Sequence, residues 1–359
     1  ITPNWISNQL FGGKDLRNAQ ERKDFLKGLS NDINIQVPVF SSLPLINFSF
    51  GSNVVSLGQV VSYTSVNIPS GLAQIPFIGL EKGKELNISS LEMEHITYLP
   101  ISYSKGFILK PGIIPFGQKS YAGLRSNLLI GLAEVHTASV NGKIQGTDAN
   151  TLIDADIELG ASLPVSIDDS IPKGSFPIGI GFDLGIITEI DEKLTIGASI
   201  DNIFASFKWS GATVYTASVL GELTPEDIAE ADSITNLLNQ SEVKESSSYK
   251  TSLPTSINIS GTYKAVEWVT LDANIRIDFG KSYWASSTPL ISLGSEFYPN
   301  SKSPFYFGLS FGGENSFGWG TGMSFKMGSV IFDISGGQLG GIFNNATGMQ
   351  LGFGLRIQK

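Results

Sequence analysis

Four stretches near the C-terminus alternate apolar and polar residues, and this period of two restricts the fold more than any other feature. The apolar positions are Val269, Leu271, Ala273, Ile275, Ile277 and Phe279 in the first stretch, Phe305, Phe307, Leu309 and Phe311 in the second, Phe317, Trp319, Met323, Phe325 and Met327 in the third, interrupted by Thr321, and Met349, Leu351, Phe353, Leu355 and Ile357 in the fourth. Such alternation predicts β-strands with one face in an apolar medium and the other in a polar one.

The polar faces of these strands carry small and ionic residues rather than the Lys, Glu and Thr of a soluble sandwich. Gly318, Gly320 and Gly322 occupy one such face, and Gly352 and Gly354 another. Glycine is a poor strand former that is kept where space is short, as in the interior of a barrel. We therefore predict an all-β fold, a transmembrane antiparallel β-barrel whose closure pairs every backbone group in the membrane. A soluble all-β sandwich or adhesin is the alternative, since soluble sheets also alternate.

A chain of 359 residues suits a barrel of roughly 12–16 strands. We predict about 14, and an even count would place both chain ends on the periplasmic side. The predicted strands are 43–51, 54–64, 92–103, 122–136, 152–164, 176–189, 194–209, 253–265, 268–279, 288–298, 305–313, 317–327, 329–336 and 348–357. Links on one side are expected to be short, with residues 137–151 as a long exception.

The N-terminal part differs from the rest. Residues 15–29 have the pattern of a short amphipathic helix, so we expect residues 1–42 to form a separate segment, a plug in the barrel or a periplasmic arm, and residues 43–359 to form the barrel. A long loop is expected at 210–252, with a helix starting at Thr224, and a helix or turn at 69–82. No secretory leader is apparent at Ile1, so an exported protein would have to be represented here by a processed or trimmed chain.

The strand at 194–209 changes phase. Ile196, Ala198 and Ile200 share one face, whereas Phe207 and Trp209 have the opposite parity, and a β-bulge near Asp201 and Asn202 would reconcile the two halves. Several aromatic residues lie at or near strand ends, as in interfacial aromatic belts; they are Trp209, Trp268, Tyr283, Trp284, Tyr298 and Trp319.

Signals for enzymatic chemistry are weak, and we expect no catalytic site and no cofactor. The pattern G-x-S-x-G around Ser310 lies in an alternating strand without a following helix, which is the wrong context for a nucleophile. Asp154, Asp156 and Glu158 alternate on one strand face and are interpreted as a solvated surface, and His95 stands apart from the other histidine, so we expect no metal site. The chain has no cysteine, and its net charge of −9 disfavours nucleic acid as a partner.

Charged and amide residues on the inward parity of the last strands are the candidate site. They are Asp272, Asn274, Arg276, Asp278, Glu296, Lys326, Asp333 and Arg356. Buried charges require partners or water, so these residues form either a structural network of ion pairs in the lumen or the polar lining of a translocation path or ligand site. Both interpretations are open at the level of sequence.

One hairpin resembles a known superfamily. Residues 178–209, IGIGFDLGIITEIDEKLTIGASIDNIFASFKW, resemble hairpins of FadL-like outer-membrane barrels, which include long-chain fatty acid transporters and the PorV-type shuttle protein of type IX secretion. The front half, with residues 14–29 followed by strands and the segment 69–83, looks like an uncharacterised branch found in Gram-negative bacteria. The resemblance implies a barrel in the bacterial outer membrane and carries over no functional residue.

From these patterns we expect a non-enzymatic outer-membrane β-barrel that passes or captures a hydrophobic or small substrate. A structural barrel that binds partners and scaffolds a secretion or cell-surface complex is the alternative. The expected partners are outer-membrane lipid, a hydrophobic ligand and other envelope proteins, with no nucleic acid.

Overall fold

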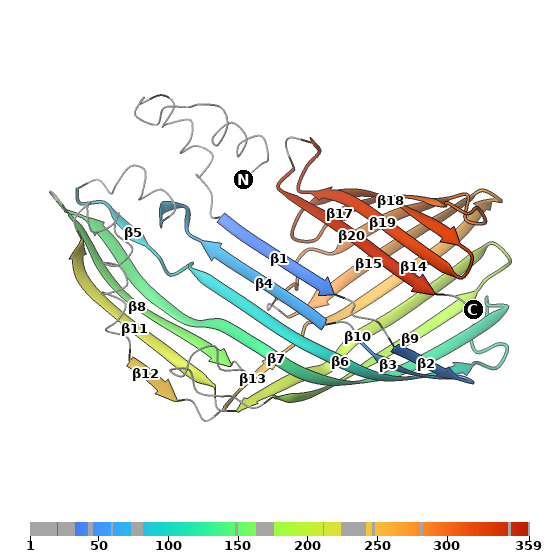
Figure 1. The fold of residues 1–359 in the computed structure, drawn as a ribbon, viewed down its shortest axis with the longest axis horizontal. Coiled ribbons are helices and arrows are strands. Elements are labelled where there is room, and N and C mark those ends of the chain that lie inside the picture. Colours follow the sequence, from blue (N-terminus) through green and yellow to red (C-terminus); the bar gives the residue numbers. More distant parts are fainter. Residues whose placement is uncertain are drawn as a thin grey trace.

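A computed structural model of the chain describes residues 20, 33–41, 46–58, 60–72, 82–147, 150–162, 176–210, 212–223, 242–245, 248–280, 283–343 and 346–357. The expected helices at 15–29 and after Thr224 lie essentially outside these residues. Within the described ranges, no helix has the length and apolarity needed to cross a membrane. The residues described form one sheet of 20 strands, and every pairing between these strands is antiparallel (Figure 1).

The strands follow one another along the chain with few interruptions. They are β1 (Ile33–Ser41), β2 (Ile46–Phe50), β3 (Asn53–Leu57), β4 (Val60–Ile68), β5 (Glu85–Asn87), β6 (Glu92–Ile108), β7 (Lys119–Gly146), β8 (Thr151–Ser162), β9 (Ile178–Glu189), β10 (Leu194–Ser210), β11 (Thr213–Leu223), β12 (Glu242–Glu245), β13 (Ser248–Ser252), β14 (Thr255–Val266), β15 (Val269–Phe279), β16 (Leu290–Phe297), β17 (Phe305–Gly312), β18 (Phe317–Met327), β19 (Val330–Leu339) and β20 (Gly348–Ile357).

Several strands are parts of one crossing of the sheet. β8 and β9 pair with successive stretches of β7, and β11 and β10 pair in turn with β8 and β9. The predicted strands 152–164 and 176–189 are therefore two halves of a single crossing, which is why the prediction of about 14 crossings is not confirmed. The long link expected at 137–151 is also wrong, because β7 continues to Gly146.

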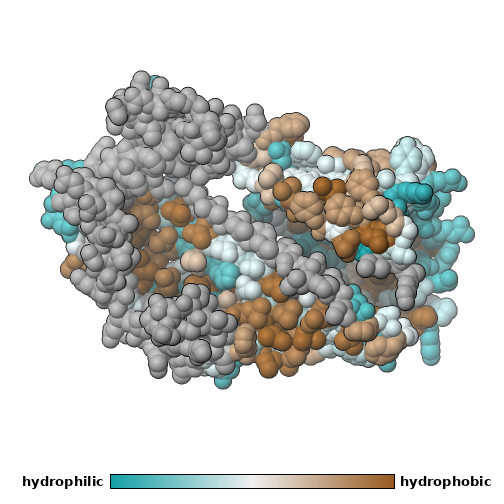
Figure 2. Space-filling view, in the orientation of Figure 1, coloured by the Kyte–Doolittle hydropathy of each residue, from teal (hydrophilic) through white to brown (hydrophobic). Residues whose placement is uncertain are grey.

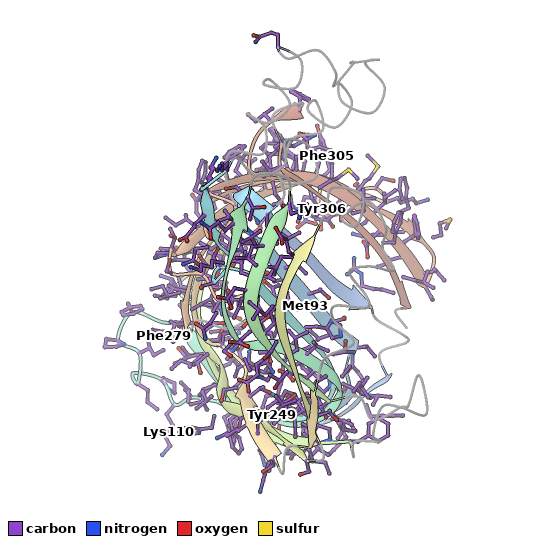
Figure 3. The ribbon with its side chains drawn as sticks, turned by 90° about the vertical axis from the view of Figure 1, so that its left-hand side faces the viewer. Met93, Lys110, Tyr249, Phe279, Phe305 and Tyr306 are labelled. Atoms are coloured by element: carbon purple, nitrogen blue, oxygen red, sulfur yellow. The ribbon has the colours of Figure 1, made fainter. Side chains whose placement is uncertain are left out.

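The main wall follows one line of hydrogen-bonded neighbours. It runs from β1 through β4, β6, β7, β9, β10 and β14, and then through β15 to β20 in chain order. The outermost strands, β1 and β20, consequently run in the same direction, so the described wall does not have the even count that was expected. Seen along its long axis, the wall curves around an inner space (Figure 3).

Two expected boundaries are also corrected. Ile33–Ser41 was assigned to the N-terminal segment but forms β1, which pairs with β4 along its whole length. The expected loop at 210–252 contains strands, since β11 and β12 pair with each other and β13 pairs with β10. Neither β1 nor the strands β11–β13 alternate as regularly as the C-terminal strands. Their local sequence pattern was therefore insufficient to predict them.

The two ends of the wall differ in their links. At one end, called the turn end, short links at 51–52, 190–193, 267–268 and 328–329 join neighbouring strands, and β20 also finishes there. In the 190–193 link, the Asp191 carboxylate accepts hydrogen bonds of 2.7 Å from the backbone N–H groups of Lys193 and Leu194, which lower its pKa. Two longer links, 109–118 and 298–304, are also at the turn end. The opposite end, called the far end, carries the links 280–289 and 340–347 and the short link 313–316. The asymmetry is partial and has the direction typical of outer-membrane barrels.

The sheet is taller on one side than on the other. Strands β9 and β15 have 12 and 11 residues, whereas β7 has 28 and continues toward the far end beside β8. This extension, made of β5, β8, β11 and the second half of β7, lies at the left of Figure 1. A strand of about 9–11 residues is enough to cross a membrane, so the wall without its extension has the height of a bilayer.

Apolar residues of the alternating strands face outward, as expected. Leu271 is 43% exposed, Leu351 is 67% exposed and Phe353 is 71% exposed. Figure 2 shows hydrophobic side chains gathered over the region of β6 and β7 and over β17–β20, with hydrophilic residues at the turn end. The Phe, Leu and Ile side chains of these strands therefore do not form a central core, which argues against the soluble sandwich.

Several inward glycines occupy places where a Cβ atom would clash. A Cβ atom on Gly337 would lie 2.4 Å from the carbonyl oxygen of Trp319, whereas one on the outward Gly336 would meet nothing closer than 3.5 Å. The difference has a simple cause: side chains converge on the concave side of a curved sheet and diverge on the convex side.

Candidate functional site

The residues predicted to face inward lie on β15–β20, and five of them line one cavity. Asp272, Asn274, Glu296, Asp333 and Arg356 surround a space of about 1000 Å³ on the concave side of β14–β20. Arg276, Asp278 and Lys326 are on the same strands but outside its lining. Figure 3 labels two consecutive residues of β17, with Tyr306 lying toward the inner space and Phe305 above it.

Ion pairs and hydrogen bonds connect most of these polar residues. Arg356 donates from Nε and Nη2 to the two carboxylate oxygens of Asp333, both at 2.9 Å, and the buried Ser324 hydroxyl also donates to Asp333. Arg276 and Asp278 pair at 2.7 Å between Nε and Oδ1. Two arginines are thus matched by two aspartates, which supports the interpretation of these four residues as a structural network.

The remaining predicted residues have weaker ties. The Lys326 ammonium donates to the carbonyl oxygen of Pro299 at 2.9 Å, and Asp272 accepts a hydrogen bond of 2.6 Å from Thr262. Asn274 and Glu296 contribute an amide and a carboxylate to the cavity lining. The result is a surface of small and polar residues with three carboxylates and one guanidinium, suited to water or to a small solute.

A second feature of the interior was not predicted as such. Seven aromatic side chains, called here the aromatic layer, gather on the inner side of the opposite part of the wall; they are Tyr63, Tyr98, Phe207, Trp209, Tyr249, Tyr283 and Trp284. Phe207 and Trp209 are 0% exposed, with ring centroids 5.7 Å apart. Such packing fills the interior at this height.

The strand that carries two of these rings is irregular where a β-bulge was predicted. The register between β9 and β10 shifts twice between Ile200 and Ser206, and Asn202 and Phe204 have positive φ values of 59° and 58°. The prediction of a bulge is confirmed, but two shifts of one residue each leave the parity of the strand unchanged. Phe207 and Trp209 therefore face inward, opposite to Ile200, and the expectation that the bulge brings both halves of the strand onto one face is wrong.

Assignment of every strand-end aromatic residue to an interfacial belt is wrong. Trp209 is fully buried and Tyr283 is 6% exposed, whereas Trp268 and Tyr298 are more than half exposed and stack on each other. The sequence carried a signal for Trp209 in the phase change of its strand. It carried none for Tyr283, whose position depends on where a link between strands folds.

The far-end link 280–289 reaches across the inner space. The backbone N–H of Tyr283 donates to the Glu94 carboxylate at 2.7 Å, and the Tyr63 ring lies 6.3 Å from that of Tyr283 and 5.8 Å from that of Trp284. Because β15 and β16 are separated from β4 and β6 by several strands of the wall, this link ties two distant parts of the sheet together.

A buried carboxylate lies beside the aromatic layer. Glu134 of β7 is 0% exposed, accepts a hydrogen bond from the Tyr249 hydroxyl, and lies 2.8 Å from Nδ1 of His136. Trp209 Nε1 donates to the Thr251 hydroxyl at 2.8 Å. Loss of one partner would leave a buried charge without its partner, so these contacts hold the aromatic layer in one arrangement.

The other motifs have structural surroundings. Ser310 lies within β17, which pairs with β18 through the short link 313–316, so the strand-to-helix turn of a nucleophile is not formed. Glu158 and Asp156 accept hydrogen bonds from Ser139 and Ser218. Within the described ranges no group of three or more His, Asp or Glu residues could hold a metal ion.

A smaller cavity of about 380 Å³ lies on the turn-end side of the aromatic layer. Tyr98 and Leu129 belong both to its lining and to the buried aromatic cluster, and the rest of its lining includes Asn127 and Asp183. The interior therefore presents, from the far end to the turn end, a buried carboxylate, an aromatic layer and an amphipathic pocket.

Comparison with known families places the chain. The pattern of the family of unknown function DUF5723 matches residues 5–334. The chain belongs to this family. The comparison with curated protein sequences gives no match.

The comparison with solved structures gives matches of low identity. The toluene transporter TbuX of Ralstonia pickettii is 10% identical, with a TM-score of 0.44 over 82% of this chain and 74% of that one. The monoaromatic hydrocarbon channel CymD is 10% identical, with a TM-score of 0.45 over 86% and 81%. A FadL homologue of Pseudomonas aeruginosa is 9% identical, with a TM-score of 0.40 over 85% and 74%.

Proposed function

We propose that the chain is an outer-membrane β-barrel protein that captures a hydrophobic or small substrate and passes it across the membrane. The outward apolar surface carries this proposal. It covers strands of the height of a bilayer, such as β9 and β15, and its residues remain exposed on the convex side. An apolar outside and a polar, small-residue inside suit a protein that lies in lipid and encloses a path.

The aromatic layer makes capture the first step of this function. Phe207 and Trp209 are fully buried and the link 280–289 packs against Tyr63, so the inner space is not a simple open pore. Passage then requires the link, or the rings it carries, to move aside, as lids do in other proteins. Tyr283 has a positive φ of 57°, an uncommon conformation for a residue with a side chain, and it marks the strained point of the link.

Conductance in planar bilayers tests this function. The wild-type protein is expected to conduct weakly, because the aromatic layer fills the interior. The double variant Tyr283→Ala and Trp284→Ala removes the two rings of the link, and we expect its single-channel conductance to rise several-fold. Its matched control is the double variant Ile342→Ala and Phe343→Ala, which removes two exposed side chains from the far-end link 340–347.

Uptake by liposomes completes the test. Vesicles that contain the protein should accumulate a small aromatic solute faster than protein-free vesicles. If uptake is unchanged and both double variants conduct like the wild type, transport is refuted and the scaffold alternative becomes the better interpretation.

A further inference from the structure

The pocket below the aromatic layer is amphipathic. One part of its lining is apolar and consists of Val61, Tyr98 and Leu129, and the adjoining part is polar and consists of Asn127, Asp183 and Arg125. These residues come from four different strands, β4, β6, β7 and β9, which meet where β10 bulges. A cavity of about 380 Å³ is at the small end of the range for ligand sites and holds a molecule with a single ring.

The apolar side is rigid. Tyr98 and Leu129 are 6% and 3% exposed and pack into the same cluster as Phe207 and Trp209. Side chains held in this way keep their positions when a ligand arrives, so little conformational entropy is lost on binding. This surface therefore selects a flat apolar group by shape.

The polar side is held in place by hydrogen bonds. The Ser102 hydroxyl donates to Oδ1 of Asn127 at 2.6 Å, and the Asn127 amide donates to Oδ2 of Asp183 at 2.9 Å. The backbone N–H of Asn202 in the bulge donates to the other carboxylate oxygen of Asp183 at 2.8 Å. The Asn127 amide nitrogen has a second hydrogen and its oxygen a second lone pair, which leaves it able to bind a ligand.

The pocket is also electrically balanced. Nη1 of Arg125 lies 3.7 Å from Oδ2 of Asp183. An anionic ligand would meet the Asp183 carboxylate and a cationic one the Arg125 guanidinium, and either would lose hydration without gaining an unshared partner. A hydrocarbon would cover the amide of Asn127 without replacing its contacts with water, which is unfavourable as well.

We propose that this pocket binds an uncharged amphiphile of single-ring size, with its ring against Tyr98 and Leu129 and a hydroxyl or amide group on Asn127. The inference rests on the proposed function and gives it a substrate class: neutral, ring-bearing molecules with one polar group, distinguished from organic anions and from plain hydrocarbons.

Binding to the full chain in lipid nanodiscs tests the substrate class, with phenol, toluene and benzoate as probes and empty nanodiscs as the blank. Calorimetry on the wild type should give the highest affinity for phenol, a lower affinity for toluene and the lowest for benzoate. In Asn127→Leu, which has the same shape but no polar group, phenol affinity should fall about tenfold while toluene affinity is kept or increased. Asn67→Leu, on β4 outside the lining of both cavities, is the matched control and should leave both affinities unchanged.

A second variant keeps the test informative if Asn127→Leu does not fold. Val61→Trp fills the pocket from β4 and should abolish the binding of both phenol and toluene. Equal losses of phenol and toluene in Asn127→Leu, wild-type phenol binding in Val61→Trp, or benzoate binding as tight as phenol would each overturn the inference. Binding without liposome uptake would refute transport alone, whereas uptake without a preference for phenol would refute the pocket alone.

Discussion

At the scale of single residues, the side of the strand on which a residue lies decides what it tolerates. Leu271 points outward from β15, whereas Asn274 lines the inner cavity three residues later. We predict that Leu271→Arg lowers the free energy of unfolding in lipid by about 2–4 kcal/mol, because a lipid-facing charge must be desolvated. Asn274→Arg, which faces the polar cavity, should change the free energy of unfolding much less.

Urea titration of both variants in lipid vesicles measures this difference. Equal stability of Leu271→Arg and Asn274→Arg would show that the outward face does not contact acyl chains. The outward exposure of Leu271 would then need another explanation.

Adjacent glycines offer a comparison of the two faces. We predict that Gly337→Ala lowers the free energy of unfolding by about 1–3 kcal/mol, because the new methyl group would overlap the carbonyl of Trp319. Gly336→Ala, on the outward face, has room and should be neutral or slightly stabilising. Denaturant midpoints of the two variants give the answer, and a reversed order would contradict the concave placement of Gly337.

At the scale of elements, the bulge in β10 is a local irregularity and not a change of face. Ile196 and Ile200 lie on one face and Phe207 and Trp209 on the other, as their even and odd positions already require, because the two register shifts cancel. The irregularity supplies the N–H of Asn202 that holds Asp183. A local defect in pairing thus supports the pocket.

Removal of one residue from the bulge is expected to be severe. Deletion of Asn202 removes one of the two extra residues of the irregularity and the N–H that holds Asp183, so pairing with β9 can be kept on both sides only with a strained backbone, and a slip by one residue would exchange the two faces. We predict loss of the folded, heat-modifiable form in gel electrophoresis. Asn202→Gly keeps the positive φ and should retain that form. A deletion variant that folds like the wild type would contradict this account of the bulge.

At the scale of the whole molecule, the asymmetry of the links predicts an orientation. Short turns of outer-membrane barrels face the periplasm, so the turn end should lie inside the outer membrane and the far end, with the extension of β7 and β8, outside. Lys110, labelled in Figure 3, is in the turn-end link 109–118, and Ile342 is in a far-end link.

Cysteine labelling tests this orientation without background, because the chain has no cysteine of its own. We predict that Ile342→Cys reacts with a membrane-impermeant maleimide on intact cells. Lys110→Cys should react only after the outer membrane is permeabilised. The opposite pattern would show that the protein has the opposite orientation. Labelling of both sites on intact cells would contradict a barrel that spans the outer membrane.

What the sequence determined by itself is local. The alternation of β15, β17, β18 and β20, the outward face of Leu271 and Phe353, the inward placement of Asp333 and Arg356, and the bulge near Asn202 all follow from periods of two residues and their interruption. Side-chain parity is a property of one strand, and so it can be read without knowledge of that strand's partners.

The tertiary structure alone decided which distant segments meet. The merging of β8 and β9 into one crossing depends on their common partner β7, and the burial of Tyr283 depends on Glu94 and Tyr63 in remote strands. Pairing between strands, unlike parity, depends on contacts between residues far apart in the chain, which leave no periodic signal. For the same reason the small pocket, assembled from four strands, became visible only when the sheet was folded.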